Sequence, residues 1–206
     1  MPSMEHSTEH LSNQEQWDER YRGEDQLWSG HVNGSLSVEV GHIEPGTALD
    51  VGCGEGADAL WLAEHGWTVT AVDISGVAIE RADAEAGRRG LDITWIAGDF
   101  PADTPGRFDL VSLHYPAFPI ADLESVANGL IDAVAPGGTL LLVGHAPPED
   151  LENAHFDPAD YVQPWDVEPR LGDGWTVEVS ETRARPGDHH HGSHHTEDVV
   201  IRARRS

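Results

Sequence analysis

The chain has 206 residues, 38% of them hydrophobic, and is therefore long enough for one sizeable domain with its own core. Its 37 acidic and 12 basic residues give a formal net charge of −25, which would repel the phosphates of nucleic acids and anionic membrane surfaces. All the basic residues are arginine, so lysine chemistry such as a Schiff base or a Walker-type phosphate loop is excluded.

The sequence also indicates a compartment. Its apolar runs are too short for a transmembrane helix, which needs about 20 such residues. The N-terminal stretch MPSMEHSTEHLSNQEQ lacks the basic start and apolar centre of a signal peptide. Cys53 is the single cysteine, so no disulfide can form within the chain. We therefore expect a cytoplasmic protein that takes a small-molecule substrate and binds neither nucleic acid nor membranes.

Two helical patterns, at residues 13–22 and 35–43, precede a regular alternation of strands and helices. Strand patterns cover residues 47–52, 67–73, 91–99, 108–114 and 138–145, and helical patterns cover residues 57–66, 75–90 and 121–134. Strands that alternate with helices in this way predict a parallel sheet covered on both faces.

The C-terminal part departs from this alternation. Residues 146–173 hold five of the 13 prolines, which predicts a covering segment or loop. Residues 175–185 and 196–205 read as strands, and the stretch PGDHHHGSHH joins them. The sheet is therefore expected to end in an antiparallel hairpin.

A glycine motif, LDVGCGEGADA, follows the first predicted strand. Gly52, Gly54 and Gly56 allow the backbone to turn tightly and to approach a ligand where a Cβ would clash. Asp73 ends the second predicted strand, where a carboxylate can accept the hydroxyls of a ribose. The motif also fits the looser GxGxxA form of dinucleotide sites, so NAD is an alternative ligand at this point.

Further features favour a different cofactor. Asp99 closes the third strand in AGDF, Pro136-Gly137-Gly138 introduces the fifth, and helices precede the first. Together with the glycine motif, these residues resemble the class I S-adenosylmethionine-dependent methyltransferases over residues 17–204. The resemblance implies an α/β fold, a Rossmann-like three-layer sandwich whose seven-stranded, mostly parallel sheet has an antiparallel last strand. It also implies S-adenosyl-L-methionine as cofactor.

The stretches WDERY, WSGHVNGSL and GADALWLAEHGWTVTAVDIS resemble one small branch of that superfamily, the tellurite-resistance and thiopurine methyltransferase-like proteins. The chain departs from the branch at Val32-Asn33, where Pro-Asn is common, and this concerns the N-terminal segment. The resemblance implies that residues 1–45 form a helical lid and residues 46–206 the methyltransferase core, as one structural domain overall.

The resemblance also assigns a cofactor site by position. The aspartate and glycines of the motif would surround the amino-acid and sulfonium part, later residues would hold the ribose and adenine, and N-terminal aromatic residues would close over the pocket. For Trp17, packing against the core is an equal alternative. Cys53 is expected to present its backbone rather than act as a nucleophile. The predicted cofactor-binding residues are Trp17, Tyr21, Trp28, Asp50, Gly52, Cys53, Gly54, Asp73, Ile74, Asp99, Phe100 and His114.

Histidines are the candidates for handling the methyl acceptor. A methyl sulfonium is already activated, so the protein must align the nucleophile and, where the nucleophile arrives protonated, supply a base. Imidazole suits that task near neutral pH. Two candidates end strands, and others lie in a loop that the hairpin places at the same edge of the sheet. The predicted catalytic residues are His114, His145, His191, His194 and His195.

The histidine loop at residues 189–195 allows three interpretations. It is a solvated polar loop, it recognises the substrate or acts as a base, or it binds a metal ion together with a histidine from a strand end. The sequence thus predicts a methyltransferase whose small-molecule acceptor is an oxygen, nitrogen, sulfur or metalloid atom. The alternatives are a metal-binding or metal-sensing protein on the same fold and, third, an NAD-dependent oxidoreductase.

Overall fold

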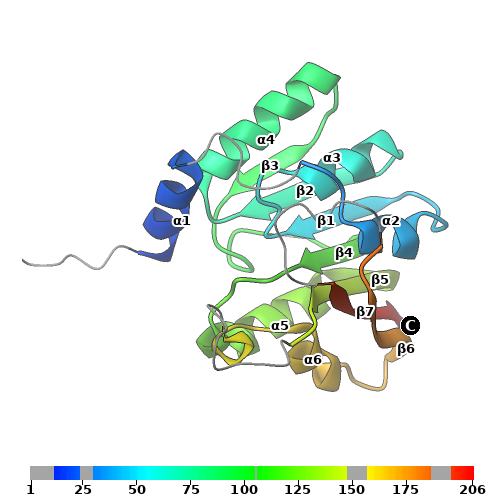
Figure 1. The fold of residues 1–206 in the computed structure, drawn as a ribbon. Coiled ribbons are helices and arrows are strands. Elements are labelled where there is room, and N and C mark those ends of the chain that lie inside the picture. Colours follow the sequence, from blue (N-terminus) through cyan, green and yellow to red (C-terminus); the bar gives the residue numbers. More distant parts are fainter. Residues whose placement is uncertain (1–11, 24–29, 105, 148–156, 187–195) are drawn as a thin grey trace, which may run out of the picture.

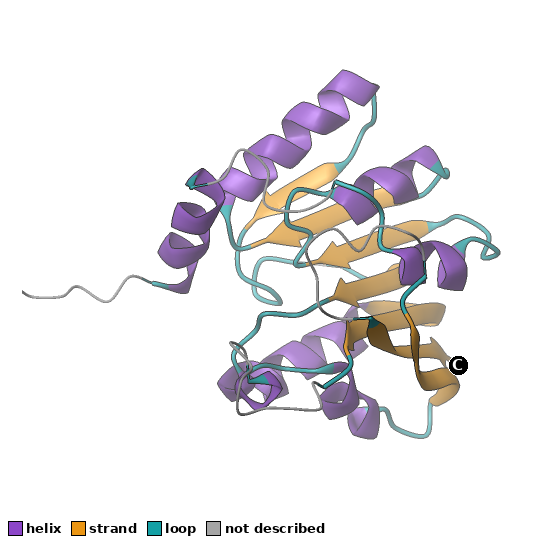
Figure 2. Ribbon diagram, viewed as in Figure 1, coloured by secondary structure: helices purple, strands orange, loops and turns teal. Residues whose placement is uncertain are grey.

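A computed structural model describes residues 12–23, 30–104, 106–147, 157–186 and 196–206. Helices cover both faces of one central sheet, giving three layers (Figure 2). The seven strands lie in the order β3-β2-β1-β4-β5-β7-β6 (Figure 1). They are β1 (Thr47–Val51), β2 (Thr68–Asp73), β3 (Thr94–Ala97), β4 (Phe108–His114), β5 (Val134–His145), β6 (Trp175–Ala184) and β7 (Glu197–Arg205).

Strands β1 to β5 pair in parallel, and β7 is antiparallel to both of its neighbours, β5 and β6. The predicted seven-stranded, mostly parallel sheet and its antiparallel last strand are therefore confirmed. Strand β6 runs in the same direction as β5, so the segment that joins β6 to β7 leaves from the carboxyl edge of the parallel strands.

The helices agree with the sequence patterns in place and differ at some ends. They are α1 (Asn13–Arg22), α2 (Gly34–Val40), α3 (Ala57–Glu64), α4 (Gly76–Arg89), α5 (Leu123–Ala133) and α6 (Pro164–Val167), with short 3₁₀ turns η1 (Ile120–Asp122), η2 (Pro158–Asp160) and η3 (Glu168–Arg170). Helix α4 is closed by Gly90, the last residue of the predicted range, which adopts a left-handed conformation with φ of 69°.

Several boundaries were predicted wrongly. For example, β3 is shorter than the predicted residues 91–99, and α2 ends at Val40 rather than at residue 43. Strand β5 begins at Val134 rather than at residue 138, because Val134 pairs with Phe108 before a bulge and the Pro-Gly-Gly stretch lies inside the strand. The segment at residues 146–173, predicted as a covering loop, contains α6 and two 3₁₀ turns in its described part. Prolines at helix starts, where no backbone donor is needed, account for this.

The two faces of the sheet have separate cores. Leu140 and Leu142 point to the face covered by α5, whereas Leu141 and Val143 point to the face covered by α2 and α3. All four side chains are buried, which explains why β5 reads as a continuous apolar run rather than an alternating one. The sheet is therefore a rigid platform whose carboxyl edge carries polar residues.

Helix α1 is fastened beside the β2–α4 turn (Figure 1). The Asp18 carboxylate accepts hydrogen bonds from Ser75 Oγ at 2.6 Å and from the Val77 backbone N–H at 3.3 Å. Arg81 on α4 donates to the carbonyl of Tyr21 at 2.6 Å. Helix α2, in contrast, buries Leu36 in the core. The division at residue 45 and the role of the preceding residues as a lid stay predictions.

In the described part of the chain, no helix combines the length and the apolar character needed to cross a membrane.

Candidate functional site

The candidate site lies at the carboxyl ends of β1, β2 and β4. The strand order reverses between β1 and β4, and open α/β sheets bind ligands in the crevice outside such a reversal. The glycine turn between β1 and α3 begins at this point, and β2 and β4 end on either side of it. The topology therefore brings the predicted ribose, sulfonium and base residues to one edge.

The three glycines of the turn have different physical roles. Gly52, Gly54 and Gly56 all have positive φ values, of 67°, 54° and 81°, which other residues rarely adopt. A Cβ on Gly52 would meet only Leu113, at 3.9 Å, so its side is open toward a ligand. A Cβ on Gly56 would lie 2.7 Å from the Trp95 ring. The first glycine therefore exposes backbone, while the third permits close packing.

The Asp73 carboxylate is fixed at the end of β2. One oxygen accepts a hydrogen bond from the Gly54 backbone N–H at 2.8 Å, and the other accepts one from the Ser75 N–H at 2.9 Å. Burial raises the pKa of Asp73, and these two hydrogen bonds offset that effect only in part. Each carboxylate oxygen has a second lone pair, so Asp73 can still accept hydroxyl donors.

Asp50 lies under the glycine turn and is almost completely buried. Its pKa is raised well above the ordinary value, first by burial and then by the negative charges of Asp58 and Asp73. Among the described residues, its Oδ2 atom has no hydrogen-bond partner. Three carboxylates at one edge of the sheet create a negative potential, which favours a cationic ligand.

His114, the last residue of β4, belongs to a buried network with Asp58 and Asn33. Its Nδ1 lies 2.8 Å from Asp58 Oδ2. Asp58 also accepts hydrogen bonds from the Asn33 backbone N–H at 2.7 Å and from its side-chain amide at 2.8 Å. Burial acts to raise the pKa of Asp58, but the His114 charge and these hydrogen bonds outweigh it and lower the pKa. Asp58 is therefore ionised and orients the imidazole.

Sequence reasoning did not identify Asp58. It lies in the first turn of α3, where an acidic residue is common because it favours the helix dipole. One sequence feature could have identified Asp58. It lies two residues after Gly56, and this position places it at the same edge of the sheet as the glycine turn.

Asp50, Asp58 and His114 also have the side-chain types that hold metal ions, and their ligand atoms lie within 4.8 Å of one another. However, the atoms of Asp58 are already used by Asn33 and His114. We interpret this group as a hydrogen-bonded network rather than as a metal centre.

Cys53 has no nucleophilic character in this setting. Burial and the negative charges of Asp50 and Asp73 raise the pKa of its thiol well above the usual range. The thiol therefore stays protonated, as expected for a residue that contributes its backbone to the turn.

The residues predicted to hold the adenine are less closely grouped. Asp99 is exposed, and its backbone N–H donates to Asp103 at 2.9 Å. Phe100 is buried in the core, with its ring centroid 6.3 Å from that of Phe118. Ile74 is partly exposed after the end of β2. Contacts of these three residues with adenine stay predictions.

On α1, Tyr21 is 3% exposed and Trp17 is partly exposed, with ring centroids 6.1 Å apart. Tyr21 is thus packed against the protein, and its contact with a cofactor stays a prediction. Several predicted site residues lie outside the described residues: Trp28, His191, His194 and His195. The metal-binding alternative depends on that histidine loop, so the described residues give it no support. The described flanks of the loop, Arg185 and Thr196, do lie at the carboxyl edge, joined by a 2.9 Å backbone hydrogen bond.

Comparison with known proteins is consistent with this geometry. Residues 48–138, from β1 to the middle of β5, match the family described as "Methyltransferase domain". This part of the chain is therefore similar to a methyltransferase domain. Two curated relatives match about half of the chain at 34% identity. They are "Ribosomal RNA small subunit methyltransferase C" of Alcanivorax borkumensis, over 47% of this chain and 31% of the relative, and "2-heptyl-1-hydroxyquinolin-4(1H)-one methyltransferase" of Mycobacteroides abscessus, over 52% and 51%. The chain thus spans about a third to a half of their lengths.

Solved structures match most of the chain, well beyond residues 48–138. A structure described as "Conversion of a Disulfide Bond into a Thioacetal Group during Echinomycin Biosynthesis" has a TM-score of 0.74 at 26% identity, over 94% of this chain and 91% of that one. The N-methyltransferase NodS from Bradyrhizobium japonicum, in complex with S-adenosyl-L-homocysteine, has a TM-score of 0.71 at 22% identity, over 94% and 99%. TehB from Haemophilus influenzae has a TM-score of 0.69 at 17% identity, over 85% and 63%. The last two likenesses concern the fold.

Proposed function

We propose that the chain is an S-adenosylmethionine-dependent methyltransferase that acts on a small-molecule nucleophile. The observation that carries this proposal is the set of carboxylates around an open glycine turn. S-adenosylmethionine brings two positive charges, on its sulfonium and its α-ammonium group, and a ribose with two hydroxyls. Buried Asp50, with its raised pKa, suits the cationic part, and Asp73 suits the ribose.

The methyl-transfer step places few demands on the protein. The nucleophile must lie in line with the methyl group at about 3 to 3.5 Å, and water must be excluded. The carboxyl ends of β4 and β5 lie next to the proposed sulfonium position, so the acceptor would bind there, beside His114 and His145. The relative named for a hydroxyquinolinone supports a small-molecule acceptor. TehB supports the tellurite-resistance branch at the level of the fold.

Titration calorimetry with S-adenosylmethionine and S-adenosylhomocysteine tests the proposal. We expect both to bind and Asp73→Ala to weaken binding about 10-fold to 100-fold, because charge-assisted hydrogen bonds are worth about 1.5 to 3 kcal/mol. Asp92→Ala, the same change at an exposed position between α4 and β3, serves as the control and should bind like the unaltered protein. Absence of binding by both compounds would contradict the proposed function.

A further inference from the structure

A second polar cluster lies beyond the glycine turn, on the side where the acceptor would bind. Its centre is Asp198, near the start of β7, whose side chain is completely buried. Asp198 pairs in the sheet with His145, the last residue of β5. Because neighbouring strands are about 4.8 Å apart, β5 lies about 10 Å from β1 across β4, which leaves room for an acceptor between His145 and the proposed cofactor site.

Residues at the ends of β4, β5 and β6 and one residue of α2 contribute groups to the cluster. The Tyr115 hydroxyl donates to Asp198 Oδ2 at 2.9 Å, and the Ser35 hydroxyl donates to the same oxygen at 3.3 Å. Arg185, just after β6, has its Nε 3.8 Å from that oxygen. His145 Nδ1 lies 3.7 Å from the other oxygen, Oδ1. Within the described part of the chain, the titratable and charged groups that surround His145 in this cluster are Asp198, Tyr115 and Arg185.

The aromatic ring of Tyr115 holds the cluster together. The His145 ring stacks on it with a centroid separation of 4.3 Å, and the Arg185 guanidinium lies 4.7 Å from its centroid. Tyr115 has a φ of 49°, and within the described part of the chain it alone among non-glycine residues has a positive φ. Such a backbone conformation in a bulky residue is costly and is found mostly at functional sites.

Protonation states in the cluster separate the possible roles. Burial and then the charge of Asp198 raise the pKa of the Tyr115 hydroxyl well above its usual value, so the hydroxyl keeps its proton. Burial acts to raise the pKa of Asp198, but the neighbouring His145 side chain, the hydrogen bond from Tyr115 and the charge of Arg185 outweigh it and lower the pKa. Asp198 is thus a carboxylate, and the imidazole that faces it is a side chain of the kind that serves as a general base in enzymes.

The two basic side chains of the cluster keep part of their surface accessible. The side chains of His145 and Arg185 are 32% and 20% exposed, whereas Asp198 is 0% exposed. Since Nδ1 of His145 faces Asp198, its Nε2 lies on the opposite edge of the ring. A ligand at the carboxyl edge would therefore contact the imidazole of His145 and the guanidinium of Arg185. These are basic groups in a protein whose formal net charge is −25. That combination suits a neutral acidic hydroxyl that becomes an anion before it attacks.

We propose that His145 is the general base for an acceptor with an acidic hydroxyl, such as a phenol or enol, that Asp198 is its positioning residue and that Arg185 binds the resulting oxyanion. This inference rests on the proposed function. The hydroxyl proton moves to Nε2 of His145, and Asp198 stabilises the imidazolium. The oxygen then forms a bond to the methyl carbon while the sulfur–methyl bond breaks. The electron pair of the broken bond stays on sulfur and gives the neutral thioether. His145 then releases the proton to solvent.

The test uses 4-nitrocatechol as a probe, because its phenol and phenolate forms absorb at different wavelengths. The probe is added at mildly acid pH to the full chain, which is saturated with S-adenosylhomocysteine. We expect the phenolate band to appear on binding to the unaltered protein and to be lost in His145→Gln. In Asp198→Asn it should fall about 10-fold or more, as expected when a base loses the partner that orients it. His42→Gln, the same change at the opposite edge of the sheet, is the control and should retain the band.

Each outcome decides the inference. A phenolate band of equal strength in His145→Gln, a bound probe that stays neutral, or no binding of the probe would overturn it. Calorimetry of S-adenosylhomocysteine with every variant keeps the two proposals apart. If this cofactor product binds normally and the probe does not ionise, the base assignment fails and the proposed function stands. If the cofactor product does not bind the unaltered protein, the proposed function itself fails. Normal binding to the variants also shows that they are folded.

Discussion

At the scale of single residues, Asp50 shows how a binding site can oppose stability. A buried carboxylate near two others costs free energy whenever it is ionised, which is the meaning of its raised pKa. The same charge is available to a cationic ligand. Replacing Asp50 by a neutral residue of the same shape should therefore stabilise the folded protein and weaken the binding of a cationic ligand.

We predict that Asp50→Asn raises the melting temperature of the ligand-free protein at pH 7 by about 3 °C, corresponding to about 1 kcal/mol in the free energy of unfolding. Because the pKa of Asp50 is raised in the folded state, its cost is absent below the ordinary pKa and develops as the pH rises through the raised value. The gain in stability should therefore vanish near pH 4. Differential scanning calorimetry over pH 4 to 8 measures this dependence.

The same variant should bind S-adenosylmethionine at least about 10-fold more weakly, because one hydrogen-bonded charge is lost. Asp83→Asn, at an exposed position of α4, is the matched control and should change neither quantity. If Asp50→Asn has an unchanged or lower melting temperature and also binds S-adenosylmethionine more tightly, then Asp50 does not face a cationic ligand.

The sequence predicted the residues of the site that follow one another along the chain and missed those that meet only in the fold. Gly52, Gly54 and Asp73 are identified by one turn and the end of the next strand. Asp58 and Asp198 are different, because their partners Asn33 and Tyr115 lie 25 and 83 residues away. A carboxylate at a helix start or in an edge strand reads as solvated surface until the topology places its partner beside it.

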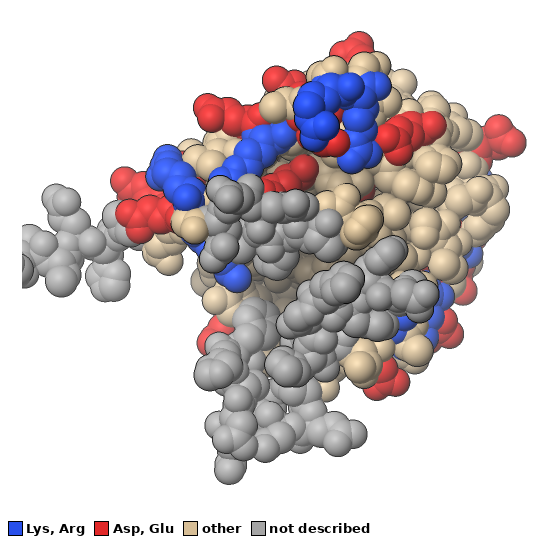
Figure 3. Space-filling model, turned by 45° about the horizontal axis from the view of Figure 1, so that its top comes forward, with Lys and Arg blue, Asp and Glu red and all other residues tan. Residues whose placement is uncertain are grey.

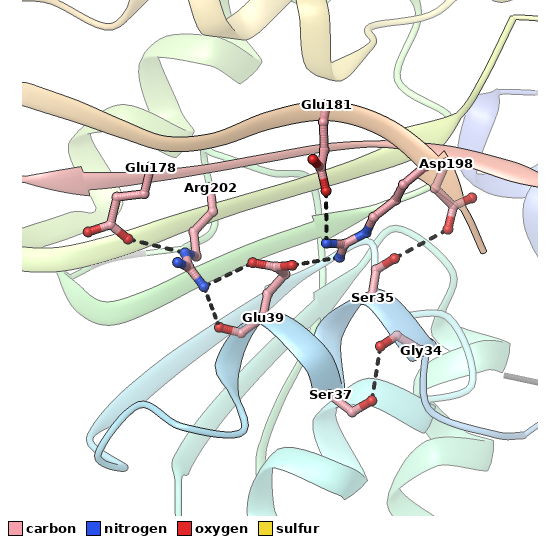
Figure 4. Close-up of polar contacts among 9 residues, drawn as sticks. Gly34, Ser35, Ser37, Glu39, Glu178, Glu181, Asp198 and Arg202 are labelled. Atoms are coloured by element: carbon pink, nitrogen blue, oxygen red, sulfur yellow. Dashed lines mark hydrogen bonds and ion pairs between the residues drawn. The ribbon is translucent and has the colours of Figure 1, made fainter. Parts of the chain in front are cut away.

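At the scale of elements, a buried ion-pair network fastens α2 to the C-terminal hairpin (Figure 4). Glu39 on α2 is nearly inaccessible and pairs with Arg183 on β6 at 2.6 Å and with Arg202 on β7 at 2.9 Å. Arg202 also donates to the Glu39 carbonyl at 3.0 Å. Ser35, one turn earlier on α2, reaches Asp198. The helix therefore connects the structural ion pairs with the cluster around His145.

We predict that Glu39→Ala lowers the free energy of unfolding by about 3 kcal/mol, because removing one partner leaves buried positive charge without compensation. Glu178→Ala is the control. Glu178 also pairs with Arg202, at 3.1 Å, but its side chain is 36% exposed, so its loss should cost about 1 kcal/mol or less. Urea denaturation at neutral pH compares the variants, and equal losses for both would contradict a special role for the buried pair.

Element boundaries were less predictable than element types. The sequence patterns placed every strand, but β5 starts earlier because its first residues pair with β4 across a bulge, a contact that Pro and Gly in the sequence obscure. Helix α3 ends two residues before Gly66 because His65 acts as its cap. Local propensity thus determines which element forms, while pairing with a neighbour determines where it ends.

At the scale of the whole molecule, charge distinguishes the chain from the relative that is named for ribosomal RNA. The formal net charge is −25, and the three arginines of α4 are already paired with acidic residues. Arg81 pairs with Glu55, Arg88 with Glu85, and Arg89 with Glu64 and Glu85. Figure 3 shows arginine side chains next to acidic ones on the visible face. Paired arginines offer little to phosphates, so the shared domain need not imply a shared substrate.

We predict that the chain does not bind ribosomal RNA. Binding to RNA depends on cationic side chains that release counterions from phosphates, so it is strongest at low salt, and a net negative protein should bind poorly even there. Fluorescence anisotropy with a labelled ribosomal RNA fragment at about 50 mM and 200 mM salt measures this, with a basic RNA-binding protein as the positive control. Binding that weakens steeply between the two salt concentrations would identify a phosphate-binding surface and contradict the prediction. Unchanged anisotropy at both would leave a small molecule as the acceptor class that the charge of the whole molecule favours.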